Sequence, residues 1–335
     1  GPRSGGIPGV FHGPLWIYLN LPAHIIGKGD PVMVGWFWVL LFVASIILVY
    51  WVGKKLWNKE VGIMSALLVS VTTLSDIHNL FNPYGAVITF PLFLYFIGKY
   101  LETKKILQLV LALFTLGIII QFQMAFGGPI LVLMIGYLIY DSIIKKNIKP
   151  LLALAVLIIP LSSFIVFELR NNFLQTHSVY NYITGVENAG KQSDPLMVTL
   201  ANRGKFMLQD VPGMLTENTA LLSIILIGAL FYSLYKNKKQ PLTIFFLYLY
   251  IGYWVLTMFY KGVIWGYYFW PFLAGLAVIL AASLQSLPRY ARYLLFFVLY
   301  MVNFIPLLGT PWVKLSAKDS SLWGFYRDTA KKVYE

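Results

Sequence analysis

Long apolar runs recur along the chain and are separated by short polar connections. As α-helices, runs of about 17–23 residues are long enough to cross a hydrocarbon core of about 30 Å. The pattern therefore predicts an all-α polytopic membrane protein with about ten transmembrane helices, near residues 31–53, 60–79, 84–100, 106–122, 128–143, 150–168, 219–235, 241–260, 267–286 and 292–309.

The same runs predict how the chain is divided. Two groups of spans, about six and then about four, are separated by one long connection and flanked by two terminal segments. The predicted segments are a first loop at 1–30, spans at 31–168, a long loop at 169–218, spans at 219–309 and a tail at 310–335.

The first loop contains its own apolar stretch, Phe11–Leu19, which is too short to span a bilayer and is interrupted by Pro14. Trp16 and Tyr18 are residue types that favour the membrane–water interface. We therefore expect an interfacial helix in this loop.

Basic residues predict the orientation of the spans. They cluster in alternate connections, and the positive-inside rule places such connections in the cytoplasm. The first loop, the long loop and the tail then lie outside, which predicts a multi-pass protein of the cytoplasmic (inner) membrane with an elaborated extracytoplasmic face. The basic residues concerned are Lys54, Lys55 and Lys59, then Lys99, Lys104 and Lys105, then Lys145, Lys146 and Lys149, then Lys236, Lys238 and Lys239, then Arg289 and Arg292.

Composition excludes several functional classes. The 335 residues are 59% hydrophobic and only 12% charged, whereas soluble domains carry about a quarter charged residues. The net charge of +13 is split into short clusters, unlike the continuous basic face of a nucleic-acid-binding protein. The chain has no Cys and no His-x-x-x-His pair, so we expect no disulfide and no metal site.

Two acidic residues near predicted outer helix ends are candidate catalytic groups. Asp76 is followed by His78 and by the Asn82-Pro83 pair, and Glu168 is followed by Arg170. Ionisable residues near a bilayer are costly and often functional. The alternatives are a solvated helix end with a turn for Asp76, and interfacial snorkelling of Arg170 beside a solvated Glu168.

Lys261 stands alone among outer-side aromatic residues, just before Tyr267 and Tyr268. A cation there could hold a lipid phosphate, although an aromatic belt with one snorkelling Lys explains the same pattern. Gln121 could hydrogen-bond a sugar, but interhelical bonding is the favoured interpretation.

Several short stretches, taken in order, resemble polyprenyl-phosphate-sugar-dependent glycosyltransferases of the GT-C fold, the superfamily of protein O-mannosyltransferases and lipid A aminoarabinose transferases. Gly13-Pro14-Leu15-Trp16-Ile17-Tyr18-Leu19 is similar to a stretch of their first external loop. Phe167-Glu168-Leu169-Arg170 resembles their exit from a spanning helix, and Tyr267-Tyr268-Phe269 with Pro271 resembles a late aromatic element.

The resemblance implies transfer of a sugar from a polyprenyl-phosphate carrier to an acceptor on the outer face. It implies a catalytic acid in the first external loop upstream of Gly1, so we expect an N-terminally truncated fragment that is inactive alone and needs no cofactor. Within this sequence we assign catalysis to Asp76 and Glu168. The predicted donor-phosphate ligands are Lys261, Arg170, Arg203 and Arg3, and the predicted cavity and acceptor contacts are His12, His78, Asn82, Gln121, Tyr267 and Tyr268.

Three other functions remain open at this point. A transporter or flippase of lipid-linked sugars would need polar residues near helix midpoints, but these are almost entirely apolar. An O-antigen-type ligase or polymerase shares a large external loop, and a membrane scaffold explains the topology alone. The predicted partners are the lipid-linked donor and membrane lipid, with the sugar and the acceptor undefined.

Overall fold

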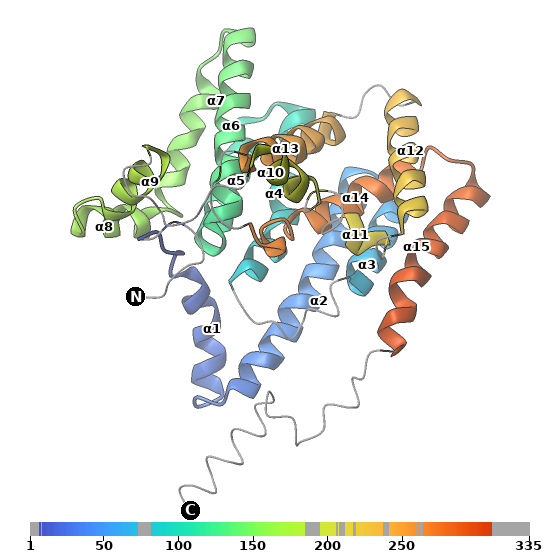
Figure 1. The fold of residues 1–335 in the computed structure, drawn as a ribbon, viewed down its shortest axis with the longest axis horizontal. Helices are drawn as coiled ribbons and strands as arrows, with labels where there is room; N and C mark the ends of the chain where they lie inside the picture. The colour runs from blue at the N-terminus through green and yellow to red at the C-terminus, as the bar shows by residue number, and fades with distance from the viewer. Residues whose placement is uncertain are drawn as a thin grey trace, which may run out of the picture.

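The structure, a computed structural model, describes residues 7, 9–72, 82–184, 195–205, 207, 212–216, 219–236, 241–258, 260 and 264–309. All regular elements among these residues are helices, which confirms the all-helical prediction (Figure 1). They are α1 (Leu15–Ile26), α2 (Pro31–Leu56), α3 (Lys59–Thr72), α4 (Pro83–Thr103), α5 (Ile106–Phe122), α6 (Met124–Lys145), α7 (Lys149–Leu152), η2 (Ala153–Ile158), α8 (Ser162–Arg170), α9 (Leu174–Thr184), α10 (Leu196–Lys205), α11 (Pro212–Thr216), α12 (Ala220–Lys236), α13 (Pro241–Thr257), η4 (Gly266–Tyr268), α14 (Phe272–Leu284) and α15 (Arg289–Gly309).

Each predicted span coincides with helical structure, but the helices differ in length. In the described part of the chain, four are long and apolar enough to cross a membrane, within α2, α4, α6 and α15. The apolar helices α5, α12, α13 and α14 have 17 residues or fewer, which corresponds to about 25 Å or less. The structure thus supports four spans, or five with the bent pair described next, and the predicted ten are not confirmed.

The run predicted as one span at 150–168 is a broken helix. The segments Lys149–Ile158 and Ser162–Arg170 are bent by 65° relative to each other. Pro160 lies at the break, where it removes a backbone donor that a continuous helix would need. A Cβ on Gly117 of α5 would lie 2.3 Å from Pro160 Cγ, so this glycine lets the break pack closely against α5.

Aromatic rings fill the centre of the helical bundle. Phe90 of α4, Phe126 of α6 and Phe272 of α14 pack edge to face, with ring centroids 4.9–5.7 Å apart. Nearly every residue of α14 is buried. Figure 1 shows α8 and α9 on one side of the molecule and α12 and α15 on the other, with α14 between them.

The predicted interfacial stretch contains a helix, although its bounds are shifted: α1 begins after Pro14 and continues through Pro22 to Ile26. It folds back on α2. Asn20 fixes the pair, because its Oδ1 accepts a hydrogen bond of 2.8 Å from Trp38 Nε1. Trp16 packs against the same Trp38 ring at a centroid distance of 4.6 Å.

Candidate functional site

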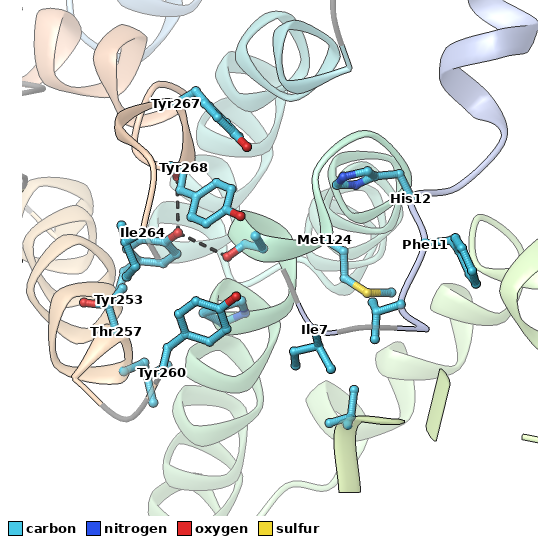
Figure 2. A pocket seen from close by; sticks show the side chains of 15 residues that line it. Ile7, Phe11, His12, Met124, Tyr253, Thr257, Tyr260, Ile264, Tyr267 and Tyr268 are labelled. Carbon is cyan, nitrogen blue, oxygen red and sulfur yellow. Dashed lines mark hydrogen bonds between the residues drawn. The ribbon is translucent and has the colours of Figure 1, made fainter. Parts of the chain in front are cut away.

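A cavity of about 270 Å³ has three walls from parts of the chain that are far apart in sequence, and Val179 of α9 also lines it. One wall is the segment from Ile7 to His12, which we call the N-terminal strap. A second wall is the start of α6 at Met124 and Ala125, and the third runs from Tyr253 in α13 to Tyr268 in η4. Figure 2 shows the strap facing the tyrosines across Met124.

Gly13 explains why the strap can lie where it does. Its backbone N–H donates a 3.0 Å hydrogen bond to the carbonyl of Gln121, at the end of α5. A Cβ at this position would lie 1.7 Å from Gln121 Oε1. Only a residue without a side chain allows so close an approach.

A second contact ties the strap to α9. The Phe11 N–H donates to Gln175 Oε1 at 2.9 Å, and the Phe11 ring packs edge to face on Phe167 of α8 at 5.9 Å. The strap is therefore held at two points, one on either side of His12.

Gln121 and Asn82, predicted as cavity residues, are not among the residues that line the cavity. Gln121 Nε2 donates to the Pro160 carbonyl at 2.6 Å and to Ser163 Oγ at 2.7 Å. Asn82 Nδ2 donates to the Phe122 carbonyl at 2.6 Å. Both amides therefore link separate parts of the chain, which for Gln121 agrees with the interhelical interpretation.

Tyr253 holds two walls of the cavity together. Its hydroxyl donates to the carbonyls of Ala125 at 3.1 Å and of Tyr268 at 3.2 Å (Figure 2). Tyr267 and Tyr268, predicted from the late aromatic element, both line the cavity.

The described lining contains no acidic or basic side chain other than His12. The imidazole lines the cavity, and partial desolvation there lowers the pKa of His12. Burial also raises the pKa of Tyr260 to about 12, assisted by Tyr182 and opposed by Arg203. These side chains are uncharged at neutral pH, so the lining described here is polar but neutral.

Among the predicted phosphate ligands that the structure describes, Arg203 contacts this lining. It comes from α10, is only 8% exposed, and donates from its guanidinium Nη2 to the carbonyl of Tyr260 at 3.1 Å. Lys261 directly follows Tyr260 in the sequence, and lies outside the described residues together with Arg3, Asp76 and His78.

Glu168 and Arg170 lie at the end of α8, where Glu168 is half-buried and Arg170 is exposed. The Glu168 carboxylate accepts hydrogen bonds from the backbone N–H groups of Gln175 and Thr176, both at 3.0 Å, and from Thr176 Oγ1 at 2.6 Å. Those N–H groups belong to the first turn of α9, where they have no partner within the helix. In this structure Glu168 therefore caps α9, and its predicted catalytic role stays a prediction.

Sequence reasoning missed Tyr253, Thr257 and Tyr260 as parts of one cavity wall. Tyr253 and Thr257 are four residues apart on one face of α13, and Tyr260 follows beyond the end of the helix. The sequence contains this spacing, but the intervening residues of α13 are equally apolar or aromatic, so the spacing does not distinguish these positions from their neighbours.

A comparison with protein families agrees with the motifs. Residues 12–167 match the family described as dolichyl-phosphate-mannose-protein mannosyltransferase. No curated protein matches the chain. Among solved structures, the archaeal oligosaccharyltransferase AglB from Archaeoglobus fulgidus, in complex with an inhibitory peptide and a dolichol-phosphate, is similar with 14% sequence identity and a TM-score of 0.41. The alignment covers 88% of this chain and 46% of AglB, so this chain spans less than half of that protein. Over residues 12–167, the family match confirms the resemblance to glycosyltransferases of the GT-C fold.

Proposed function

We propose that this chain is part of a membrane glycosyltransferase that moves a sugar from a polyprenyl-phosphate carrier to an acceptor on the outer face of the cytoplasmic membrane. One observation carries the proposal. His12, Tyr267 and Tyr268 were selected from separate motifs, and they line the same cavity. The family match over residues 12–167 supports the same reaction class.

The cavity suits a neutral, hydroxyl-rich group better than a charged one. Tyrosine rings offer flat apolar faces together with hydroxyl groups, and the neutral His12 ring offers one donor and one acceptor. A sugar ring can stack on Tyr267 or Tyr260 and exchange hydrogen bonds with these groups. Pockets that bind small molecules commonly combine an apolar lining with a few such polar atoms.

In the proposed reaction, the acceptor hydroxyl oxygen attacks the anomeric carbon of the sugar. The bond from that carbon to the phosphate oxygen breaks, the proton passes to a carboxylate base, and polyprenyl phosphate leaves as an anion. A guanidinium stabilises the leaving phosphate through charge-assisted hydrogen bonds. We assign this role first to Arg203, next to the cavity wall, and then to Lys261, Arg170 and Arg3.

The proposed base is a carboxylate. Asp76 is the first candidate, from the sequence. Glu168 would have to release its bonds to α9 before it could accept a proton, so we place it second.

We further propose that the ten apolar helices all cross the bilayer. The short helices α5, α12, α13 and α14 would then span a locally thinned bilayer or lie partly within protein. This places the cavity on the outer side, where the basic residues are rare.

The test is binding of polyprenyl phosphate, the product lipid, to the purified chain in detergent, followed by intrinsic tryptophan fluorescence. Replacing Arg203 by Gln removes a charge-assisted contact, which is worth about 1.5–3 kcal/mol, so we expect affinity to fall about 10- to 100-fold. Arg203→Lys keeps the charge and should retain most of the binding.

The matched control is Arg289→Gln, which removes an exposed guanidinium at the start of α15. It should leave binding unchanged. Equal losses in Arg203→Gln and Arg289→Gln would contradict the assignment of Arg203. In proteoliposomes, movement of an intact lipid-linked sugar across the bilayer without sugar transfer would favour the flippase alternative instead.

A further inference from the structure

A second polar cluster lies at the opposite ends of the helices that form the cavity. α6 begins at the cavity wall and ends at Lys145, and its 22 residues correspond to a length of about 33 Å. Lys104, the residue that follows α4, lies beside Lys145. We call Lys104, Lys145, Tyr100 and Asp141 the lysine-end cluster.

Asp141 organises this cluster from within. Its side chain is 9% exposed. One carboxylate oxygen accepts a 3.1 Å hydrogen bond from the Tyr100 hydroxyl, and the other pairs with the Lys145 ammonium. The carboxylate is thus fixed between α4 and α6, and its charge is balanced by a single lysine.

Lys104 brings a second ammonium group to the same place. Its backbone is left-handed, with φ of +57°, and its Nζ lies 5.3 Å from the centroid of the Tyr100 ring. Burial lowers the pKa of Lys104, and the nearby Lys145 charge lowers it further, while Asp141 opposes the shift. Two cations therefore share one carboxylate.

Two other basic side chains at this end of the bundle have partners within the protein. Arg292 pairs with Glu60 at 2.9 Å, and Lys236 donates to the Ser286 carbonyl at 3.0 Å. In the lysine-end cluster, two ammonium groups lie near a single buried carboxylate. An anion placed between the two ammonium groups would relieve their repulsion.

Apolar side chains beside the cluster indicate what kind of anion fits. Ile143 and Ile144, next to Lys145, are exposed, as are Ile106 and Leu107 at the start of α5. A phosphate that carries acyl chains would contact both the cations and this apolar surface, whereas a free phosphate would use the cations alone. Basic pockets between spanning helices are suited to anionic lipid head groups.

We propose that Lys104 and Lys145 bind the phosphate of an anionic phospholipid, with its acyl chains against the exposed residues of α5 and α6. The site is separate from the sugar cavity and holds a structural lipid rather than the glycosyl donor.

The experiment is native mass spectrometry of the full chain, purified from nanodiscs of phosphatidylcholine containing a small fraction of phosphatidylglycerol. Lys104→Gln leaves the Asp141–Lys145 pair intact, so the fold should be kept. A basic residue near an anionic membrane surface contributes about fivefold to binding, so we expect about fivefold less phosphatidylglycerol bound. Lys104→Arg should restore it.

Lys55→Gln is the matched control, because it removes an exposed lysine from another basic connection. Equal retention of phosphatidylglycerol in Lys104→Gln and Lys55→Gln, with both proteins showing native melting temperatures, would overturn the proposal. Displacement of the lipid by inorganic phosphate at millimolar concentration would also overturn it, because the site would then recognise a free anion. Binding of polyprenyl phosphate should be unchanged in Lys104→Gln, which keeps this test independent of the proposed function.

Discussion

At the scale of single residues, Gly13 and His12 set the shape of the cavity. The strap passes so close to α5 that Gly13 has no room for a side chain. His12, the preceding residue, is thereby brought onto the cavity wall. The contact of Gly13 with Gln121 thus gives a physical reason for the glycine in the Gly13-Pro14 motif.

Gly13→Ala tests this contact. The added methyl would meet Gln121 Oε1 at 1.7 Å, so the strap or the amide must move, and overpacking of this kind costs about 1–3 kcal/mol. We expect a lower melting temperature in detergent. Gly128→Ala in α6 is the control, since its Cβ would meet nothing within 4 Å, and it should be neutral or slightly stabilising. Equal melting temperatures for the two variants would show that the strap is not packed as described.

The lowered pKa of His12 predicts a pH dependence of stability. Between its lowered native pKa and about 6.5, the unfolded chain binds a proton at His12 that the native chain does not. Stability is therefore expected to fall as the pH drops through this range. His12→Gln should remove this contribution, so that its melting temperature falls less than that of the wild type between pH 8 and pH 5. His24→Gln provides the comparison for loss of an imidazole outside the cavity; if it has the same effect as His12→Gln, the assignment is wrong.

At the scale of elements, the start of α9 depends on Glu168. This carboxylate closes the turn between α8 and α9, and α9 in turn holds the strap through Gln175. A helix cap therefore connects the Phe167–Arg170 motif to the cavity without any direct contact between Glu168 and the cavity lining.

Glu168 variants separate capping from catalysis. Glu168→Ala removes the acceptor for Gln175 and Thr176, which should cost about 1 kcal/mol and speed hydrogen exchange of amides at the start of α9. Glu168→Gln keeps an acceptor oxygen, so most of the exchange protection should remain. If Glu168→Gln nevertheless abolishes sugar transfer while α9 stays protected, Glu168 acts as a base and its capping role is secondary.

At the scale of the whole molecule, the helical bundle has two chemically different ends. One end carries the neutral tyrosine-lined cavity, and the other carries the lysines that follow α4 and end α6. A neutral end opposite a lysine-rich end is the arrangement that the positive-inside rule predicts for a protein whose site faces the outer side.

Labelling of single introduced cysteines tests that orientation. The chain has no native Cys, so only the introduced residue can react with a maleimide. Asn172→Cys lies just after α8 and Lys105→Cys lies between α4 and α5, and both positions are exposed. A maleimide that cannot cross membranes should label Asn172→Cys in intact cells and Lys105→Cys only after permeabilisation. The reverse pattern would place the cavity in the cytoplasm.

The positions of the apolar helices follow from the sequence alone, because run length, apolar content and flanking turn residues are local properties. The sequence also supplied His12, Tyr267 and Tyr268 as candidates. It could not show that the run at 150–168 bends, since this depends on Pro160 packing against Gly117 of another helix. Nor could it distinguish the linking role of Gln121 from sugar binding.

Which candidate residues share a site depends on how distant helices pack against each other. His12 and Tyr268 are separated by more than 250 residues in the sequence, and no local pattern encodes their contact with one cavity. The contact follows from the close approach at Gly13 and from the two bonds of Tyr253. Tertiary packing likewise places the Arg203 guanidinium against the Tyr260 carbonyl, and the Glu168 carboxylate at the start of α9. Local patterns choose the elements, but packing between distant elements decides which side chains share a site.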